Sequence, residues 1–270
     1  CHYLNNTVSY AVAFAIWNKV NKQLFIARDA LGVKPLYYSV QDDFFVFASE
    51  AKSIIPLLIG KDEYDIETIN RYLCFLWSPG SGTSLKSVKK LLPGQAMLVG
   101  TERILSKWTW YQLPVCRRKR LATSKTDLLQ ETAVKLRQAV HRQLVSDVPV
   151  GAFLSGGLDS SAVVAFAREK IPNLSCFTIE VSGGQGDGFT DDLPYAKQVA
   201  SFLHVDLEVV SINASKMAAD LERMVYQLDE PLADPAPLYV FYISELARSQ
   251  GIKVLLSGAG GDDLFSGYRR

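Results

Sequence analysis

The strongest constraint on the fold is the alternation of helix-type and strand-type segments in the second half of the chain. Between residues 127 and 256, amphipathic patterns alternate with short apolar runs such as Ala152–Leu154 and Val254–Leu256. Apolar runs without a polar face are typical of strands that are covered on both sides, as in a parallel sheet. The pattern therefore predicts a parallel, doubly wound α/β sheet whose ligands bind outside the carboxyl ends of the strands.

The first hundred residues have a different pattern. Short segments rich in aromatic and β-branched residues are separated by polar turns, which is typical of antiparallel strands. We expect strands at Tyr10–Trp17, Leu24–Ala27, Leu36–Val40, Phe44–Ala48 and Ala96–Val99, and helices at Glu50–Leu58 and Asp65–Trp77, the second with Asp65 as its N-cap. The predicted division is a first domain over 1–107, a linker over 108–125 and a second domain over 126–270.

Composition excludes several functional classes. The chain has 270 residues and a formal net charge of +1, so nucleic acid is not an expected partner. No apolar run approaches the length needed to span a membrane, so a membrane is not expected either. The four cysteines are scattered and only three histidines occur, which disfavours a disulfide scaffold or a zinc site and favours reduced thiols in a cytoplasmic protein. Because the chain lacks an initial methionine and stops after a glycine-rich loop, we expect it to be part of a longer protein.

The segment from Ser155 to Ser160 reads Ser-Gly-Gly-Leu-Asp-Ser and follows a predicted strand directly. Glycines there allow a tight turn, and backbone N–H groups at the start of the next helix, with the hydroxyls of Ser155, Ser160 and Ser161, can donate to a phosphate. The letters required for a Walker loop, a serine-hydrolase elbow or a dinucleotide fingerprint are absent. The turn therefore predicts a phosphate site of another kind.

Asp159 is unusual in such a turn because a carboxylate repels an anion unless a cation lies between them. Mg²⁺ binds one or two carboxylates together with phosphate oxygens, which resolves the conflict. A second loop, Ser257–Asp263, is also rich in glycine and acidic residues and ends another predicted strand. The two loops are interpreted as a clamp for Mg²⁺ and pyrophosphate; the alternative is two unrelated turns whose aspartates cap helices.

Residues 146–161 and 256–268 closely resemble the signature loops of the glutamine-hydrolysing asparagine synthetases of the B type. Four further segments, collinear with that family, resemble the later part of its glutaminase domain: Phe14–Trp17, Ala27–Tyr38, Phe47–Lys52 and Leu92–Gly94.

The resemblance implies a remnant of an antiparallel αββα glutaminase domain of the N-terminal-nucleophile hydrolase type, followed by a synthetase domain of the ATP-pyrophosphatase type. It implies ATP and Mg²⁺ as cofactors and small molecules as partners: glutamine or ammonia, and aspartate or another carboxylate. The oligomeric state stays open, with a homodimer as one option. The matching ATP residues are Leu154, Ser155, Gly156, Gly157, Asp159, Ser160, Ile179, Ser257 and Gly258, and the catalytic, metal-binding carboxylates are Asp159 and Asp262.

Two departures from the family pattern limit what the resemblance implies. Cys1 is followed by His2 and Tyr3, whereas the family's nucleophilic cysteine is followed by Gly-Ile, so we expect an ordinary cysteine and no glutamine hydrolysis by this chain alone. Ala259 stands where the family has Glu near the reacting carboxyl group. Three hypotheses remain open: amidation of aspartate, amidation of another carboxylate such as a sugar uronate, and nucleotide binding without catalysis.

Overall fold

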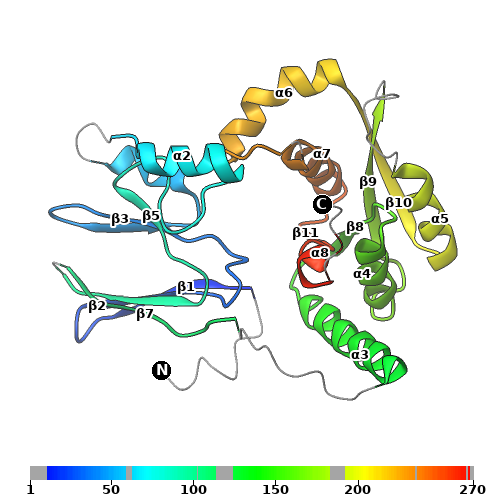
Figure 1. Cartoon of the computed structure of the whole chain (residues 1–270), viewed down its shortest axis with the longest axis horizontal. Coiled ribbons are helices and arrows are strands. Elements are labelled where there is room, and N and C mark those ends of the chain that lie inside the picture. The colour runs from blue at the N-terminus through cyan, green and yellow to red at the C-terminus, as the bar shows by residue number, and fades with distance from the viewer. Residues whose placement is uncertain are drawn as a thin grey trace. The chain divides into compact units, whose positions relative to one another are not determined.

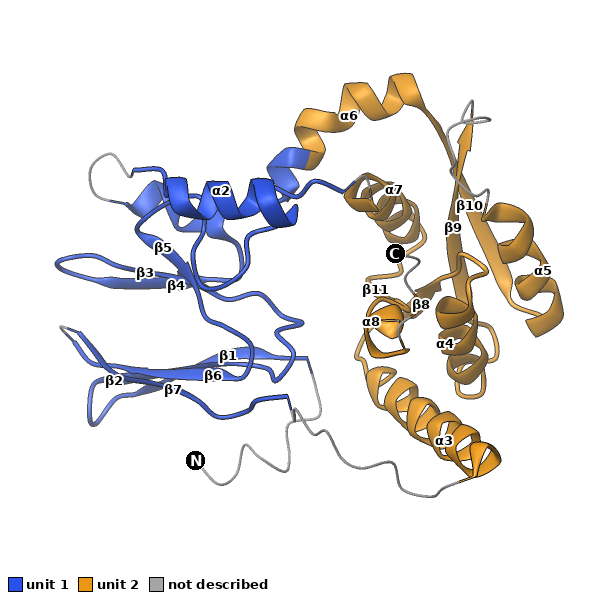
Figure 2. Cartoon of the chain, viewed as in Figure 1, with its two compact units in different colours: residues 1–118, 225–234 blue, residues 119–224, 235–270 orange. Residues whose placement is uncertain are grey.

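The computed structural model describes residues 11–58, 63–101, 103–113, 124–182, 192–234, 236–265 and 267. The chain divides into two compact units (Figures 1 and 2). Unit 1 comprises residues 1–118 and 225–234, and unit 2 comprises residues 119–224 and 235–270. Within the described ranges, no helix has the length and apolarity needed to cross a membrane.

Unit 1 is built on two antiparallel sheets. The first has the order β1-β2-β6-β7 and the second the order β4-β3-β5. The strands are β1 (Ala13–Asn18), β2 (Gln23–Arg28), β3 (Tyr37–Val40), β4 (Phe45–Ala48), β5 (Val88–Lys90), β6 (Gln95–Val99) and β7 (Ile104–Thr109). One hydrophobic cluster, which includes Ile26, Tyr38 and Met97, joins the two sheets. Successive residues of a strand point to opposite faces, so Tyr37 lies on the other face of β3 and packs with Ala51, Ile54 and Val88.

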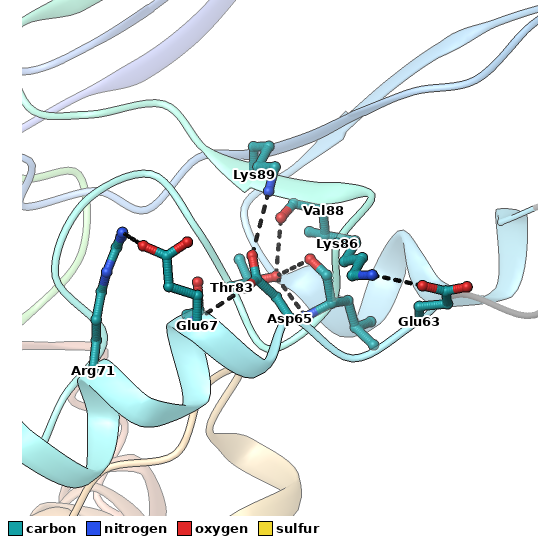
Figure 3. Close-up of polar contacts among 10 residues, drawn as sticks. Glu63, Asp65, Glu67, Arg71, Thr83, Lys86, Val88 and Lys89 are labelled. Atoms are coloured by element: carbon teal, nitrogen blue, oxygen red, sulfur yellow. Dashed lines mark hydrogen bonds and ion pairs between the residues drawn. The ribbon is translucent and has the colours of Figure 1, made fainter.

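Helix α2 (Ile66–Phe75) has the N-cap that the sequence predicts. The Asp65 side chain accepts a hydrogen bond from the Thr68 N–H at 3.0 Å, and Lys89 forms an ion pair with Asp65 at 3.8 Å (Figure 3). This hydrogen bond holds the pKa of Asp65 below its usual range. The Thr83 hydroxyl donates to the Val88 carbonyl oxygen at 2.9 Å and so ties the loop after α2 to β5.

The predicted helix Glu50–Leu58 is wrong. Two 3₁₀ turns, η1 (Ala51–Ser53) and η2 (Ile55–Leu57), occupy this segment. Pro56 lies in the middle of the predicted helix, where it cannot donate an N–H and disfavours the helical conformation of Ile55 before it. The sequence analysis also missed β5 and β7, and β7 continues through Thr109, two residues into the segment assigned to the linker. Most of that linker lies outside the described residues.

Unit 2 contains a four-stranded parallel sheet with the order β10-β9-β8-β11. Its strands are β8 (Val150–Phe153), β9 (Ser175–Ser182), β10 (Asp206–Asn213) and β11 (Val254–Leu256), and its helices are α3 (Lys125–Gln143), α4 (Leu158–Arg168), α5 (Leu193–Leu203), α6 (Ala214–Gln227), α7 (Ala236–Ser249) and the short α8 (Gly261–Phe265). The predicted doubly wound sheet is confirmed.

Helices cover both faces of this sheet. Cys176 on β9 packs in a cluster with Val140 of α3, Val164 of α4 and Ala196 of α5. Phe177, the next residue, packs on the opposite face against Ile243 and Ala247 of α7. Burial of the Cys176 thiol between the sheet and these helices raises its pKa to about 12. The apolar residues of α3 are not all buried: Leu129 near its start is exposed, whereas Val140 near its end is buried.

Candidate functional site

The two glycine-rich loops lie at the point where the strand order of the parallel sheet reverses. From β8 the chain adds β9 and β10 on one side, and it then returns to place β11 on the other side of β8. Val254 is the register partner of Val150 and Leu256 that of Ala152, so β8 and β11 run in the same direction and end at the same rim. Ligands of doubly wound sheets bind at this kind of switch point.

The first loop, Leu154–Gly157, turns the chain from β8 into α4. Gly156 has φ +82°, and a Cβ built on it would lie 2.5 Å from the Ala196 nitrogen of α5, so no other residue fits without displacing α5. Gly157 is the N-cap of α4 and has no side chain to satisfy the first N–H groups of the helix. These donors and the positive end of the helix dipole are therefore available to an anion.

The serine hydroxyls of the first loop hold the loop itself. The Ser155 N–H donates to Ser160 Oγ at 3.3 Å, Ser160 Oγ donates to the Gly157 carbonyl oxygen at 3.2 Å, and the Gly157 N–H donates to Ser155 Oγ at 3.3 Å. Ser155 and Ser160, expected as phosphate donors, thus shape the turn in this structure. Ser161 Oγ is buried and has no hydrogen-bond partner among the residues that the structure describes.

The second loop packs directly on the first. A Cβ built at Gly258 would lie 2.7 Å from the Ser160 nitrogen and 2.9 Å from the Asp159 carbonyl carbon. A Cβ at Gly261, the residue before Asp262, would collide with the Asp159 carboxylate. Glycine is therefore required at both positions for this close approach. The structure brings Asp159 to the same loop that carries Asp262.

The carboxylates of Asp159 and Asp262 at this rim fit a magnesium site. In the described ranges, no hydrogen bond or ion pair joins the side chain of Asp159 or Asp262 to another residue, and no group of three or more histidine, cysteine or acidic side chains could hold a metal by itself. A pair of free carboxylates fits Mg²⁺, which completes its coordination with phosphate oxygens and water.

Ile179 lies on β9, which pairs with β8 on the side opposite to β11. The register between β8 and β9 stops at Phe153 and Phe177, and the Leu154 N–H donates to the Phe177 carbonyl oxygen at 2.9 Å. Backbone groups of alternate residues point to the same neighbour, so those of Ile179 point to the space beyond the end of β8. This orientation suits a backbone that reads the edge of a planar base.

Ser257 and Gly258 follow β11 directly. Ser257 Oγ accepts from the Ala259 N–H at 3.1 Å, which tightens the second loop, and the Ala259 methyl group is exposed. The sequence analysis did not single out Gly261, although its closeness to Asp159 is what brings the loops together. The consecutive glycines at 260 and 261 are the signal that could have identified it.

Comparisons with known proteins find relatives of both units. The family model described as "Asparagine synthase" matches residues 131–270, and the model described as "Glutamine amidotransferase domain" matches residues 6–111. The chain is 34% identical to asparagine synthetase [glutamine-hydrolyzing] 1 of Bacillus subtilis and 34% identical to a putative asparagine synthetase of Mycobacterium tuberculosis, over 95% of the chain in both cases. It is 30% identical, also over 95%, to a Penicillium rubens protein named amidase chyE. The chain spans 39% of the length of each of these relatives.

Proposed function

Because the chain belongs to the asparagine synthase family, we propose that it forms part of an ATP-dependent ligase that amidates a carboxylic acid with ammonia taken from glutamine. In this proposal unit 2 activates the carboxylic acid with ATP, AMP and pyrophosphate are released, and unit 1 is part of the glutaminase. The observation that carries the proposal is the contact between Gly261 and the Asp159 carboxylate at the switch point of the sheet.

Several groups of the site would act in the adenylation step. The N–H groups at the start of α4 would hold the phosphates of ATP, and Asp159 and Asp262 would hold Mg²⁺ against them. When bound, the ion neutralises the charge that develops on the pyrophosphate leaving group. The backbone of Ile179 would bind the adenine edge, which aligns the α-phosphate with the incoming carboxylate. Ammonia then displaces AMP from the acyl-adenylate.

Aspartate is the acceptor we propose first, since two of the relatives are named asparagine synthetases. Ala259 favours a second candidate, another carboxylate such as a sugar uronate. An alanine methyl group cannot exchange a proton with the incoming ammonia, and it leaves more room than the glutamate that the family resemblance leads one to expect. Amidation of aspartate would then require another group to accept the proton.

The test is ATP–pyrophosphate exchange by the full-length natural protein with a panel of carboxylates. Exchange that depends on aspartate, followed by asparagine formation when glutamine is added, supports the first candidate. Exchange that depends on another acid supports the second. ATP binding without exchange for any acid contradicts the ligase proposal and leaves a nucleotide-binding protein. The same assay without Mg²⁺ is the control for the metal, and we expect no exchange in it.

A further inference from the structure

The acidic turn of the second loop lies between two glycines. Gly260 has φ +93°, and the Gly261 N–H donates to the Gly258 carbonyl oxygen at 3.1 Å, so the chain turns sharply from β11 into α8 (Figure 1). Beyond the end of α8, the Gly267 N–H donates to the Asp262 carbonyl oxygen at 3.2 Å. This hydrogen bond returns the chain to the first turn of α8 and brings Gly267 beside Asp262.

Gly267 lies directly against the Asp262 side chain. A Cβ built on Gly267 would collide with Asp262 Oδ1, and it would lie 3.0 Å from Asp262 Cγ. The space that a side chain would need at this position is therefore taken by a carboxylate oxygen. Gly267 does not have a left-handed φ, so its backbone conformation is one that alanine also adopts. Close approach, rather than backbone conformation, is the reason for glycine here.

The other carboxylate of the proposed magnesium pair has the same kind of neighbour. The three atoms nearest to a Cβ built on Gly261 are Oδ2, Cγ and Oδ1 of Asp159, and Gly261 likewise has no left-handed φ. Each of the two carboxylates thus packs on the α-carbon of one glycine: Asp159 on Gly261, and Asp262 on Gly267.

The other glycines of the two loops differ from this pair in the atoms that they meet. The atoms nearest to a Cβ on Gly156 or Gly258 are backbone atoms of α5 or of the first loop and the start of α4. Backbone atoms move only when their whole element moves, whereas a carboxylate rotates about the bonds of its own side chain. An alanine at position 267 would therefore turn the Asp262 carboxylate and leave the fold in place.

Hydrogen bonds do not set the direction of either carboxylate. Within the ranges that the structure describes, none joins the side chain of Asp159 or Asp262 to another residue. Both aspartates are half-buried, whereas Asp263, the next residue of the same turn, is exposed. Among the described residues, packing against glycine is thus what restrains these two side chains.

We propose that Gly267 is a positioning residue that orients the Asp262 carboxylate toward the magnesium ion. This rests on the function proposed above. Mg²⁺ demands nearly ideal octahedral geometry, so a ligand that is turned away from it costs affinity. Groups that orient a metal ligand typically contribute about 10- to 100-fold to metal affinity. Gly267 makes this contribution by having no side chain, because the Asp262 carboxylate lies where a methyl group would be.

The experiment compares Gly267→Ala with the wild type in the full-length natural protein. Calorimetry measures the binding of α,β-methylene-ATP, which cannot release pyrophosphate, at a series of Mg²⁺ concentrations. ATP–pyrophosphate exchange is measured over the same series. We expect the half-saturating Mg²⁺ concentration to rise about tenfold or more in both measurements. Excess Mg²⁺ should restore the exchange rate, because it fills the weakened site by mass action.

The melting temperature without nucleotide separates this effect from a loss of stability. It should stay within about 3 °C of the wild type, because only the end of one side chain has to rotate. Gly261→Ala is the second variant and should raise the Mg²⁺ requirement in the same way, through Asp159. Gly100→Ala, in unit 1, is the matched control and should leave the Mg²⁺ requirement unchanged, since its added methyl group meets the Leu105 side chain.

Three outcomes decide between the proposal and its alternatives. A lower maximal rate of exchange with an unchanged Mg²⁺ requirement in Gly267→Ala is what a purely structural defect predicts, and it would overturn the proposal. Loss of the cooperative melting transition would overturn it as well, because rotation of a carboxylate does not unfold a protein. Wild-type protein that binds α,β-methylene-ATP without any dependence on Mg²⁺, or does not bind it, contradicts the proposed function instead.

Discussion

Each unit has a loop that combines an aspartate with glycines, and the two loops use these residues in opposite ways. In unit 1 the Asp29 carboxylate accepts hydrogen bonds from the N–H groups of Leu31, Val33 and Lys34 at 3.0–3.1 Å. Asp29 is buried. In unit 2, no described residue donates to the Asp159 carboxylate. A saturated carboxylate stabilises its own loop, whereas an unsaturated one at the edge of a sheet is available to a ligand. The same residue types thus serve structure in unit 1, and we propose that they serve binding in unit 2.

The largest expected effects come from removing the two carboxylates in turn. Asp159→Ala should lower ATP–pyrophosphate exchange by about 10²- to 10³-fold, as loss of a charge-stabilising group does, and change stability by at most about 1 kcal/mol. Asp29→Ala leaves three backbone donors without an acceptor and should destabilise unit 1 by about 3 kcal/mol or more. Its exchange activity per folded molecule should be normal, because Asp29 does not belong to unit 2.

Tryptophan fluorescence separates these two outcomes. The four tryptophans of these 270 residues, at positions 17, 77, 108 and 110, are in unit 1, so denaturant titrations of a polypeptide with this sequence, followed by fluorescence, report the unfolding of that unit. The Asp29 variant should shift this transition and the Asp159 variant should not. A shift of equal size in both variants, or normal exchange by the Asp159 variant, would remove the contrast between the two loops.

The next effect tests the contact between the loops of unit 2. Gly258→Ala places a methyl group 2.7 Å from the Ser160 nitrogen, so the loops must separate, and displacements of about 1 Å can cost about 10²-fold in rate. We expect a loss of exchange of this order with little change in fluorescence-detected unfolding. Gly100→Ala is the control in unit 1, where the three atoms nearest to the added methyl group belong to the flexible Leu105 side chain, the nearest at 3.3 Å. If Gly258→Ala keeps full exchange activity, the loops do not act together.

The smallest effect concerns the N-cap of α2. Asp65→Ala should destabilise unit 1 by about 1 kcal/mol at pH 7, because the Thr68 N–H loses its acceptor. The folded-state pKa of Asp65 lies below the unfolded value of about 3.9, so the stability from its charge is present above that value. It disappears as the pH falls through the folded pKa.

The difference in unfolding midpoint between the wild type and Asp65→Ala should therefore shrink as the pH falls below about 4 and through the folded pKa of Asp65. Asp65→Asn is the matched variant, since asparagine caps helices about as well as aspartate and carries no charge. At pH 7 it should be more stable than Asp65→Ala and less stable than the wild type, and its stability should lack the part that depends on the Asp65 charge. A difference between wild type and Asp65→Ala that stays constant down to pH 2 would show that the charge of Asp65 has no part in the cap.

The features predicted correctly from the sequence depend on local signals. The strand–glycine–helix order around Ser155 and around Ser257 marks both loops, and the alternation of elements predicts the parallel sheet that brings them together. The cap at Asp65 is local as well. The prediction of a helix at Glu50–Leu58 was wrong because Pro56 disfavours a continuous α-helix in this segment.

The features that were missed depend on residues far apart in the sequence. Glu230 meets Tyr37 and Lys90 only in the folded unit, and no local pattern distinguishes Asp229 and Glu230 from surface acids. The strand β5 has only three residues, Val88–Lys90, two of them lysines, and pairing with β3 rather than propensity makes it a strand. A single sequence does not show which distant residues pair in the folded protein.

The pairing of Val254 with Val150 has a consequence for biosynthesis. These partners are separated by roughly one hundred residues, so the loop closure that joins them is costly and slow compared with local hairpins. A ribosome-bound chain from which β11 has not yet emerged lacks the second of the two loops that we propose to bind ATP, and it should fail to retain ATP. We therefore expect affinity for the nucleotide to appear only when β11 has paired with β8, so that it marks the completion of unit 2 during synthesis.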